Sequence, residues 1–266
     1  MIAAKDPGAV DYTAYGINDA LLIDNTGVFK DRDALSIHLK AKGIAKVILT
    51  APGKEVPNIV YGINHRDLDI ENETIFSAAS CTTNAASPLI AILDEALGID
   101  KAVLNTVHGY TASQALVDGP SKKDLREGRA AAQNIVPSST GAAIAVTKAF
   151  PKLEGLFDGI SIRVPVPAGS IVDVTFISMR KTSAEEVNDI LKKAAASEKW
   201  SKIFAVTNEP LVSSDILGNS HASIADLEMT RVVGGTLVKV LGWYDNEMGY
   251  THTLVDHVIK TGNTIK

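Results

Sequence analysis

Short apolar runs separated by polar turns characterise residues 1–80 of the chain. Residues 20–23 read Ala-Leu-Leu-Ile, and a second apolar run over residues 46–50 ends before a Pro-Gly turn. Between these runs, the pattern from about Asp31 to Lys42 predicts a helix that stops at Gly43. Strand, helix and strand in this order predict a βαβ unit whose two strands pair in parallel.

Longer strands are predicted after about residue 100. The runs that carry strand-like patterns cover residues 102–107, 161–166, 171–179 and 237–243. Helical patterns lie between and after them, and Ser183-Ala184-Glu185-Glu186 is a capping box ahead of an amphipathic stripe. This arrangement predicts a second domain with a large mixed or antiparallel sheet that carries its helices on one face.

The only cysteine, Cys81, lies where the pattern changes from strand to helix. An apolar run over residues 74–79 precedes it, and residues 85–97 have apolar positions at roughly helical spacing. A thiol at a helix N-terminus meets free backbone N–H groups and the positive end of the helix dipole, which lower its pKa and can hold an oxyanion. A buried structural cysteine is the alternative, and position alone does not decide between the two.

Composition excludes several classes of function. A chain of 266 residues with 45% hydrophobic residues can form one large domain or two ordinary ones with a substantial core. A single cysteine fits a reducing compartment. A net charge of −5 does not indicate the basic surface that binding of nucleic acid requires. The six histidines form no metal-ligand cluster with the cysteine, and no apolar stretch reaches transmembrane length. We therefore expect a cytoplasmic protein with no metal, nucleic-acid or membrane partner.

A thiol nucleophile needs a base, and His108 is the best-placed histidine because it follows the apolar run at 103–107. Arg163 stands in an otherwise buried strand, so we expect it to meet a carboxylate or a phosphate. Thr140 and Gly141 offer a hydroxyl and backbone N–H groups to an anion at another predicted helix start. Together these residues describe a thiol enzyme that acts on an anionic carbonyl compound.

Five motifs, in this order and spacing, resemble the phosphorylating glyceraldehyde-3-phosphate dehydrogenase family. They are SCTTN at 80–84, TVHGYT at 106–111, PSSTGAA at 137–143, IRVPVP at 162–167 and WYDNEMGY at 243–250. The likeness runs from about Ala3 to the end of the chain. It implies the glycolytic, NAD-dependent oxidation and phosphorylation of glyceraldehyde 3-phosphate to 1,3-bisphosphoglycerate, in glucose metabolism, by a homotetramer.

The resemblance also implies roles for individual residues. Cys81 would be the nucleophile that forms a thioester, and His108 its ion-pair partner and general base. The residues that match the family's inorganic-phosphate site are Ser80, Thr82, Thr140 and Gly141, and those that match its substrate-phosphate contacts are Thr111 and Arg163. The residues that match the nicotinamide site are Thr26, Gly27, Thr50, Asn246, which holds the carboxamide, and Tyr250.

One departure from the family concerns the front of the cofactor domain. The G-x-G-x-x-G turn that holds the pyrophosphate occurs nowhere in the chain, and Met1 matches a point well inside that domain. We therefore expect an α/β plus α+β fold from a truncated gene, with a genuinely short protein as the alternative. A partial Rossmann-type parallel sheet over residues 1–80 is completed by the C-terminal helix at 249–266, and a catalytic domain spans residues 81–248. The cofactor is expected to be NAD, with NADP and the activity of this chain alone left open.

A second departure lies in the substrate-phosphate pocket, where Ser113 and Glu127 replace an aspartate and an arginine of the family. A carboxylate beside a phosphate dianion is repulsive. Either Arg126, Arg129 or Lys123 supplies the missing cation, or the natural substrate is another phosphorylated aldehyde such as erythrose 4-phosphate. An alternative of another class is an inactive fragment that serves as an interaction partner or a subunit of a mixed oligomer.

Overall fold

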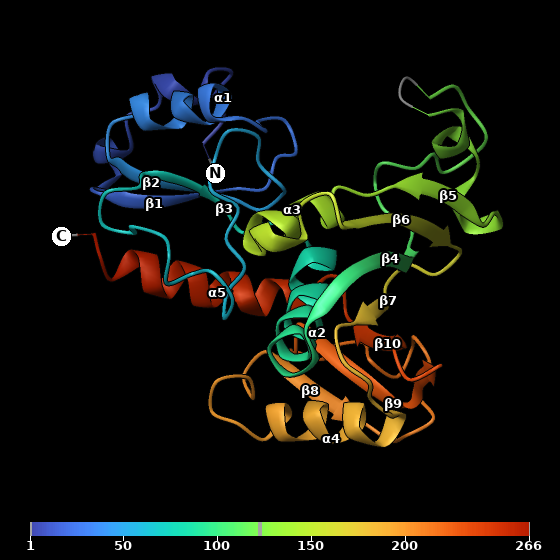
Figure 1. The fold of residues 1–266 in the computed structure, drawn as a ribbon. Helices are drawn as coiled ribbons and strands as arrows, with labels where there is room; N and C mark the ends of the chain where they lie inside the picture. The colour runs from blue at the N-terminus through green and yellow to red at the C-terminus, as the bar shows by residue number, and fades with distance from the viewer. Residues whose placement is uncertain (1, 122–123, 266) are drawn as a thin grey trace. The chain divides into compact units, whose positions relative to one another are not determined.

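The computed structural model describes residues 2–121 and 124–265, which divide into two compact units (Figure 1). The first unit takes the residues up to Ser80 together with those from Thr253 onward, and the second unit is Cys81–His252. The last helix, α5 (Met248–Gly262), contributes residues to both.

A three-stranded parallel sheet is the centre of the first unit, with the strand order β1-β2-β3. Its strands are β1 (Ala20–Asp24), β2 (Ile44–Leu49) and β3 (Ile75–Ser77), and two short 3-10 turns, η1 (Pro7–Ala9) and η2 (Tyr12–Tyr15), precede them. Leu22 of β1 lies opposite Val47 of β2 in parallel register. The predicted βαβ unit is therefore confirmed.

The connection between β1 and β2 differs from the predicted continuous helix. The α-helix α1 (Arg32–Ser36) makes one turn after its N-cap and tightens into the 3-10 turn η3 (Ile37–Lys40). In η3 the buried His38 donates from Nε2 to Oδ2 of Asp24 at 2.7 Å. This tertiary hydrogen bond favours the tighter turn over the local helical preference that the sequence pattern shows.

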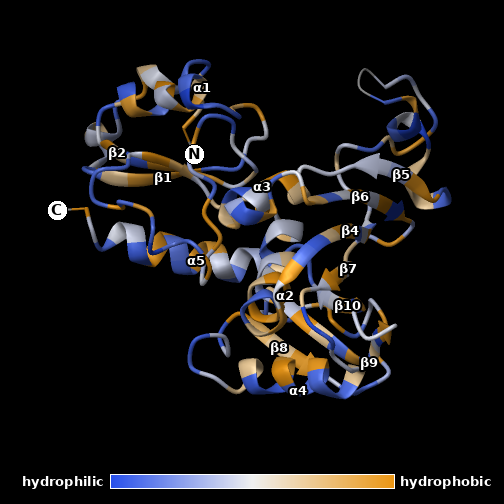
Figure 2. Cartoon of the chain, viewed as in Figure 1, coloured by the Kyte–Doolittle hydropathy of each residue, from blue (hydrophilic) through white to orange (hydrophobic). Residues whose placement is uncertain are grey.

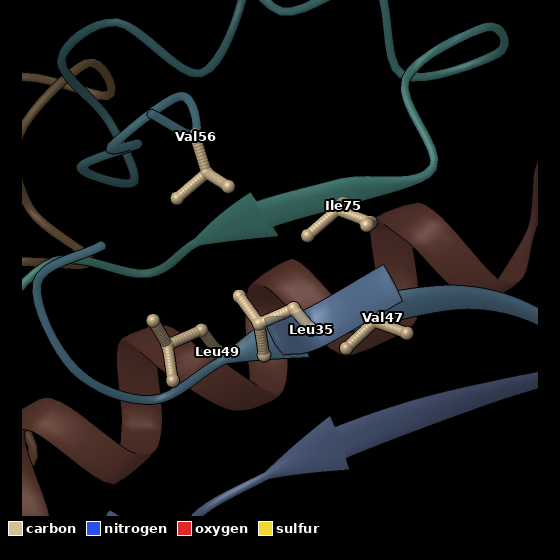
Figure 3. Close-up of a cluster of buried hydrophobic side chains, with 5 residues drawn as sticks. All are labelled: Leu35, Val47, Leu49, Val56 and Ile75. Atoms are coloured by element: carbon tan, nitrogen blue, oxygen red, sulfur yellow. The ribbon is translucent and has the colours of Figure 1, made fainter. Parts of the chain in front are cut away.

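Five side chains form the apolar core under α1: Leu35, Val47, Leu49, Val56 and Ile75 (Figure 3). Each is at most 6% exposed. Val47 and Leu49 are alternate residues of β2 and so share one face of the sheet. Burying side chains of this size stabilises the fold by about 1.5–3 kcal/mol each, so this cluster holds α1 against the sheet.

His257 of α5 is buried in the same unit against Tyr61 and Phe76, with ring centroids 5.3 and 5.8 Å away. Burial lowers the pKa of His257 from 6.5 to about 4, and the charges on His65 and Lys260 act in the same direction. As the pH falls, the unfolded chain binds this proton first, near the ordinary pKa. The free energy of unfolding must therefore fall between about pH 6.5 and pH 4 and level off below that.

We expect this loss to be on the order of 2–3 kcal/mol. Urea unfolding at a series of pH values measures it. Replacing His257 with leucine should flatten the profile across the window, whereas replacing the exposed His252 with leucine should leave it as steep as in the natural chain. Equal slopes for the two variants would contradict the assignment.

The second unit contains a seven-stranded mixed sheet, β5-β6-β4-β7-β10-β9-β8. The pairs β4–β6 and β8–β9 are parallel, and the remaining neighbours are antiparallel. The four predicted longer strands are confirmed as β4, β6, β7 and β10, while β5, β8 and β9 were not predicted. The strands are β4 (Ile99–Gly109), β5 (Val136–Ser139), β6 (Phe157–Val164), β7 (Ser170–Ser178), β8 (Phe204–Thr207), β9 (Ser223–Val233) and β10 (Leu237–Tyr244).

Three helices cover one face of this sheet, as the sequence pattern predicted. Helix α2 (Cys81–Leu97) packs on the central strands, α3 (Ala142–Ala149) on β6, and α4 (Ala184–Ala195) on β8 and β9. Gly242 of β10 lets α2 come close, because a Cβ there would lie 2.7 Å from Leu89. Ser183 caps α4 as predicted, with its Oγ accepting from the Glu186 N–H at 3.2 Å, whereas the Glu186 carboxylate accepts from Arg180 and Thr182 and does not complete the box. Apolar and polar residues alternate along this helix (Figure 2).

The opposite face of the sheet is partly exposed and apolar. Val103, Ile160 and Leu237 are 59%, 55% and 40% exposed there. The connection between β4 and β5 has only two short 3-10 turns, η4 (Leu125–Gly128) and η5 (Ala131–Gln133), and a third, η6 (Pro151–Leu153), precedes β6. Within residues 2–121 and 124–265, no helix is long and apolar enough to cross a bilayer, and no cluster of His, Cys, Asp and Glu could hold a metal ion.

Candidate active site

Cys81 is the first residue of α2 and is half-buried. A sharp turn precedes it, in which the buried Ala79 adopts the left-handed conformation with φ of 58°. Ser77 Oγ fixes this turn by accepting from the Ala79 N–H at 2.9 Å and donating to the Ala51 carbonyl at 2.6 Å. A left-handed alanine costs about 1 kcal/mol, so the surrounding hydrogen bonds hold a strained turn that starts the helix at the thiol.

Strand β4 brings His108 to this thiol. Alternate residues of β4 face the helices, so Thr106 and His108 are both buried on the side that α2 covers. His108 Nε2 lies 3.5 Å from Cys81 Sγ, within hydrogen-bond reach of sulfur. The structure therefore places the two residues that sequence analysis assigned to nucleophile and base in direct contact.

The protonation of this pair differs from the sequence-based expectation. Burial raises the pKa of the Cys81 thiol, and it outweighs the hydrogen bonds from Thr82 and the charge of Arg163, which lower that pKa. Burial also lowers the pKa of His108 to about 4, with Arg163 acting in the same direction. The direction of the thiol pKa shift is therefore opposite to the lowering that the sequence predicted.

Arg163 lies beside the histidine because β6 runs parallel to β4 with Arg163 opposite His108 in register. Its Nη1 donates to His108 Nδ1 at 2.6 Å and to the Gly109 carbonyl at 3.4 Å, and its buried Nε has no partner. In the described part of the chain it forms no salt bridge with a carboxylate. The expected carboxylate partner is thus not found, and the guanidinium can bind an external anion.

Tyr244 is a site residue that sequence analysis did not assign. Its buried hydroxyl bonds Thr82 Oγ1 at 3.0 Å and Thr106 Oγ1 at 2.8 Å, and its ring meets the His108 ring edge-on at 5.8 Å. Tyr244 therefore ties the first turn of α2 to β4, which fixes the distance between Cys81 and His108. The sequence could have indicated Tyr244 as a site residue, because a tyrosine in an apolar strand needs a hydrogen-bond partner for its buried hydroxyl.

The residues matched to anion sites are spread over several elements. Thr140 Oγ1 accepts from the Ala142 N–H at 3.1 Å at the start of α3, which packs against α2, and the neighbouring Gly141 is exposed. Thr111 follows β4 and its hydroxyl pairs with Ser113 Oγ at 3.0 Å. Within the described residues, Thr111 and Thr140 form no hydrogen bond with Cys81, His108 or Arg163.

The unusual Glu127 is engaged with a neighbouring strand, since Ser138 Oγ donates to its Oε1 at 2.8 Å. The two arginines considered as replacement cations bind local carboxylates: Arg126 lies 4.0 Å from Asp124, and Arg129 lies 3.1 Å from Asp118. The third candidate, Lys123, lies outside the described residues. The described contacts therefore leave Arg163 as the cation at this site.

Asn246 in the second unit has the geometry of a carboxamide ligand. Its Oδ1 accepts from the Gly169 N–H at 3.0 Å and from Ser170 Oγ at 3.0 Å. These two donors fix the amide orientation, so Nδ2 is the end that can donate to the carboxamide oxygen of a nicotinamide. Tyr250 follows within α5, and burial together with the Cys81 charge raises its pKa. These residues fit a nicotinamide cofactor.

In the first unit, Thr26 and Gly27 follow the C-terminal end of β1, and Thr50 follows that of β2. Ligands of parallel sheets bind at this edge. Both threonine hydroxyls serve the turn itself: Thr26 Oγ1 donates to Asp24 Oδ1 at 2.8 Å, and Thr50 Oγ1 donates to the Asp24 carbonyl at 3.1 Å. Gly27 has φ of 71° and open space at its Cβ position, so the backbone can approach a ligand closely.

A thiol in contact with an imidazole, next to a guanidinium without a carboxylate, defines a thiol-dependent enzyme for anionic carbonyl compounds. Comparison with known proteins makes this class specific. The family model for the C-terminal domain of glyceraldehyde 3-phosphate dehydrogenase matches residues 80–246.

Curated relatives extend the match over the whole chain. Glyceraldehyde-3-phosphate dehydrogenase 1 of Streptomyces avermitilis is 42% identical over 266 residues, which cover 100% of this chain and 78% of the relative. The enzymes of Borreliella burgdorferi and Streptococcus pyogenes are 44% and 43% identical, over 96% and 95% of this chain and 77% and 74% of theirs. The chain belongs to the glyceraldehyde-3-phosphate dehydrogenase family, an oxidoreductase family that uses a nicotinamide cofactor. The resemblance inferred from the five motifs is confirmed.

Proposed function

We propose that this chain catalyses the NAD-dependent oxidation and phosphorylation of glyceraldehyde 3-phosphate to 1,3-bisphosphoglycerate. The observation that carries the proposal is the 3.5 Å contact between Cys81 Sγ and His108 Nε2 at the N-terminus of α2, in a chain of this family. The names of the relatives favour this substrate over erythrose 4-phosphate, and they favour an enzyme over an inactive fragment that acts as an interaction partner.

In the proposed reaction, His108 Nε2 removes the thiol proton and Cys81 Sγ attacks the aldehyde carbon. The oxyanion of the resulting hemithioacetal lies at the first turn of α2, where the Cys81 N–H and His108 can stabilise it. His108 returns the proton to this oxyanion to give the hemithioacetal hydroxyl, and Nε2 takes it back while the carbon loses a hydride and becomes a thioester on Cys81. The nicotinamide, when bound, accepts the hydride. Inorganic phosphate cleaves the thioester and releases an acyl phosphate and the free thiol.

The remaining site residues have the roles that the motif resemblance implies. Inorganic phosphate is held by Ser80, Thr82, Thr140 and Gly141, and the substrate phosphate by Thr111 and Arg163. The residues that hold the nicotinamide of NAD are Thr26, Gly27, Thr50, Asn246 and Tyr250. We assign residues 1–80 with the helix at 249–266 to the cofactor domain and residues 81–248 to the catalytic domain. The division of the chain between Ser80 and Cys81 supports this assignment.

We also infer a cytoplasmic homotetramer. The exposed apolar residues Val103, Ile160 and Leu237 on the uncovered sheet face support burial against a second copy of the chain. A single half-buried cysteine supports a reducing compartment.

The test is an assay of the purified chain with glyceraldehyde 3-phosphate, NAD and inorganic phosphate. We expect reduction of NAD that depends on the aldehyde, together with formation of an acyl phosphate. When phosphate is left out, intact mass should show an acyl group on Cys81. Reduction of NAD without any acylation of Cys81 would refute the thioester route.

Arg163 gives a sharper prediction about the substrate phosphate. Replacing it with leucine removes a charge-assisted hydrogen bond, about 1.5–3 kcal/mol, and should raise KM for glyceraldehyde 3-phosphate roughly 10- to 150-fold. KM for NAD should stay close to its natural value. The matched control is Arg231→Leu on β9, which removes an exposed arginine. An equal rise in both variants would show that net charge, and not a contact to the substrate, is responsible.

A further inference from the structure

Ser170 is the first residue of β7, and its buried hydroxyl contacts two parts of the site that are distant in sequence. Its Oγ lies 3.2 Å from the nitrogen of Gly109, which follows His108 at the end of β4. It also lies 3.0 Å from Oδ1 of Asn246, in the turn between β10 and α5. One hydroxyl therefore joins the strand that carries the proposed base to the amide that is proposed to hold the nicotinamide.

The hydrogen bonds at this hydroxyl can run in one direction only. The Gly169 N–H lies 3.0 Å from the same Asn246 atom, and because a backbone N–H only donates, that atom must be the amide oxygen. An amide oxygen only accepts, so Ser170 must give it the hydroxyl proton. The lone pairs of Ser170 Oγ then accept from the Gly109 N–H. Donation from Gly109 through Ser170 to Asn246 directs Nδ2 of the amide away from both donors.

The two donors are held more firmly than the amide that they orient. Gly169 has φ of 90°, and a Cβ there would lie 2.6 Å from the Ser213 carbonyl oxygen, so its backbone is closely packed. Ser170 pairs with Tyr244 in the antiparallel register of β7 and β10. Asn246 lies in a turn, where rotation of its terminal amide would exchange Oδ1 and Nδ2. A rotated amide would present an oxygen to the carboxamide oxygen of a nicotinamide, and two acceptors repel each other.

We propose that Ser170 is a positioning residue that orients Asn246 for the nicotinamide carboxamide and ties this amide to the end of β4. The inference rests on the proposed function, since it requires a nicotinamide cofactor held by Asn246. It adds that the group bound by Asn246 must present a hydrogen-bond acceptor. It also adds that this amide and His108 keep one spacing, because both are fixed through the same hydroxyl.

A buried hydroxyl at the other end of β7 provides the matched control. Ser178 is 3% exposed, and its Oγ donates to the Arg180 carbonyl at 2.8 Å and to the Thr236 carbonyl at 3.2 Å. Neither partner is a proposed site residue. Replacing either serine with alanine removes one buried, hydrogen-bonded hydroxyl from the same strand, so effects that appear only in Ser170→Ala belong to the site.

The first measurement is 1H–15N NMR of the full chain with neither NAD nor aldehyde present. The Nδ2 signals of Asn246 are identified by their loss in Asn246→Ala. We expect Ser170→Ala to shift these signals and to move the Gly109 amide proton upfield, because each group loses its bond to the hydroxyl. Ser178→Ala should leave both in place.

The Asn246→Ala variant tests the same connection from its other end. The Gly109 amide proton should shift there too, although no described hydrogen bond joins Gly109 to Asn246, because Ser170 then loses its acceptor. An unchanged Gly109 signal in Asn246→Ala overturns the proposal even if Ser170→Ala does not fold.

Calorimetric titration with NAD is the second measurement. Ser170→Ala should weaken NAD binding roughly 2- to 13-fold, the factor that corresponds to one neutral hydrogen bond, and Ser178→Ala should bind as the natural chain does. In the Asn246→Ala background, Ser170→Ala should cause no further loss, because the amide that it orients is absent. Equal losses in the two backgrounds would show that Ser170 acts through another group. The dehydrogenase assay can fail separately, because neither measurement depends on turnover.

Discussion

Replacing Cys81 with serine is expected to lower kcat/KM for glyceraldehyde 3-phosphate by on the order of 10⁴-fold or more. The substitution exchanges one atom at the start of α2 and should leave the contacts of that helix intact. A hydroxyl is far less acidic than a thiol, and burial already raises the pKa of this group. His108, with a pKa lowered to about 4, is too weak a base to deprotonate a serine at a useful rate.

Steady-state kinetics measure this loss, and urea unfolding of the same variant shows whether the fold is retained. Cys81→Ala is the matched control, since it removes the side-chain nucleophile altogether. Equal losses in the two variants would show that serine contributes nothing as a nucleophile. If Cys81→Ser kept its activity within tenfold of the natural chain, the cysteine would be structural, which is the alternative that its position in the sequence left open.

The fold was largely predictable because buried apolar residues recur along the sequence at the spacing of a strand or of a helix. The run at 46–50 became the largely buried central strand β2, and the run at 20–23 became the edge strand β1, in which Ile23 is 39% exposed. The helix between them was misjudged, because a contact between Asp24 and His38, distant in sequence, tightened its second half into a 3-10 turn. The local sequence pattern gives no information about this contact.

The chemistry of the site was less predictable than its location. The change from strand to helix at Cys81 gave the position of the thiol, and the helix N–H groups suggested a lowered pKa. Burial reverses that direction, and burial depends on how α2 packs against the sheet. The contact between Arg163 and His108 follows from the parallel register of β4 and β6, which no local sequence pattern reports.

Replacing His108 with asparagine is expected to lower kcat on the order of 10²- to 10⁴-fold, the usual contribution of a general acid–base group. KM should change less, because Arg163 and not His108 is the proposed contact to the substrate phosphate. The ring is unprotonated above its pKa of about 4, so kcat/KM of the natural chain should fall as the pH drops toward 4.

In His108→Asn this fall in kcat/KM at low pH should disappear, so that kcat/KM is low and constant down to pH 4. Kinetics over this range, with activity rechecked after return to neutral pH, separate the base from acid unfolding caused by His257. The exposed His252→Asn variant is the control and should keep both the natural rate and the fall at low pH. If the fall in kcat/KM at low pH persists in His108→Asn, another group must be the base.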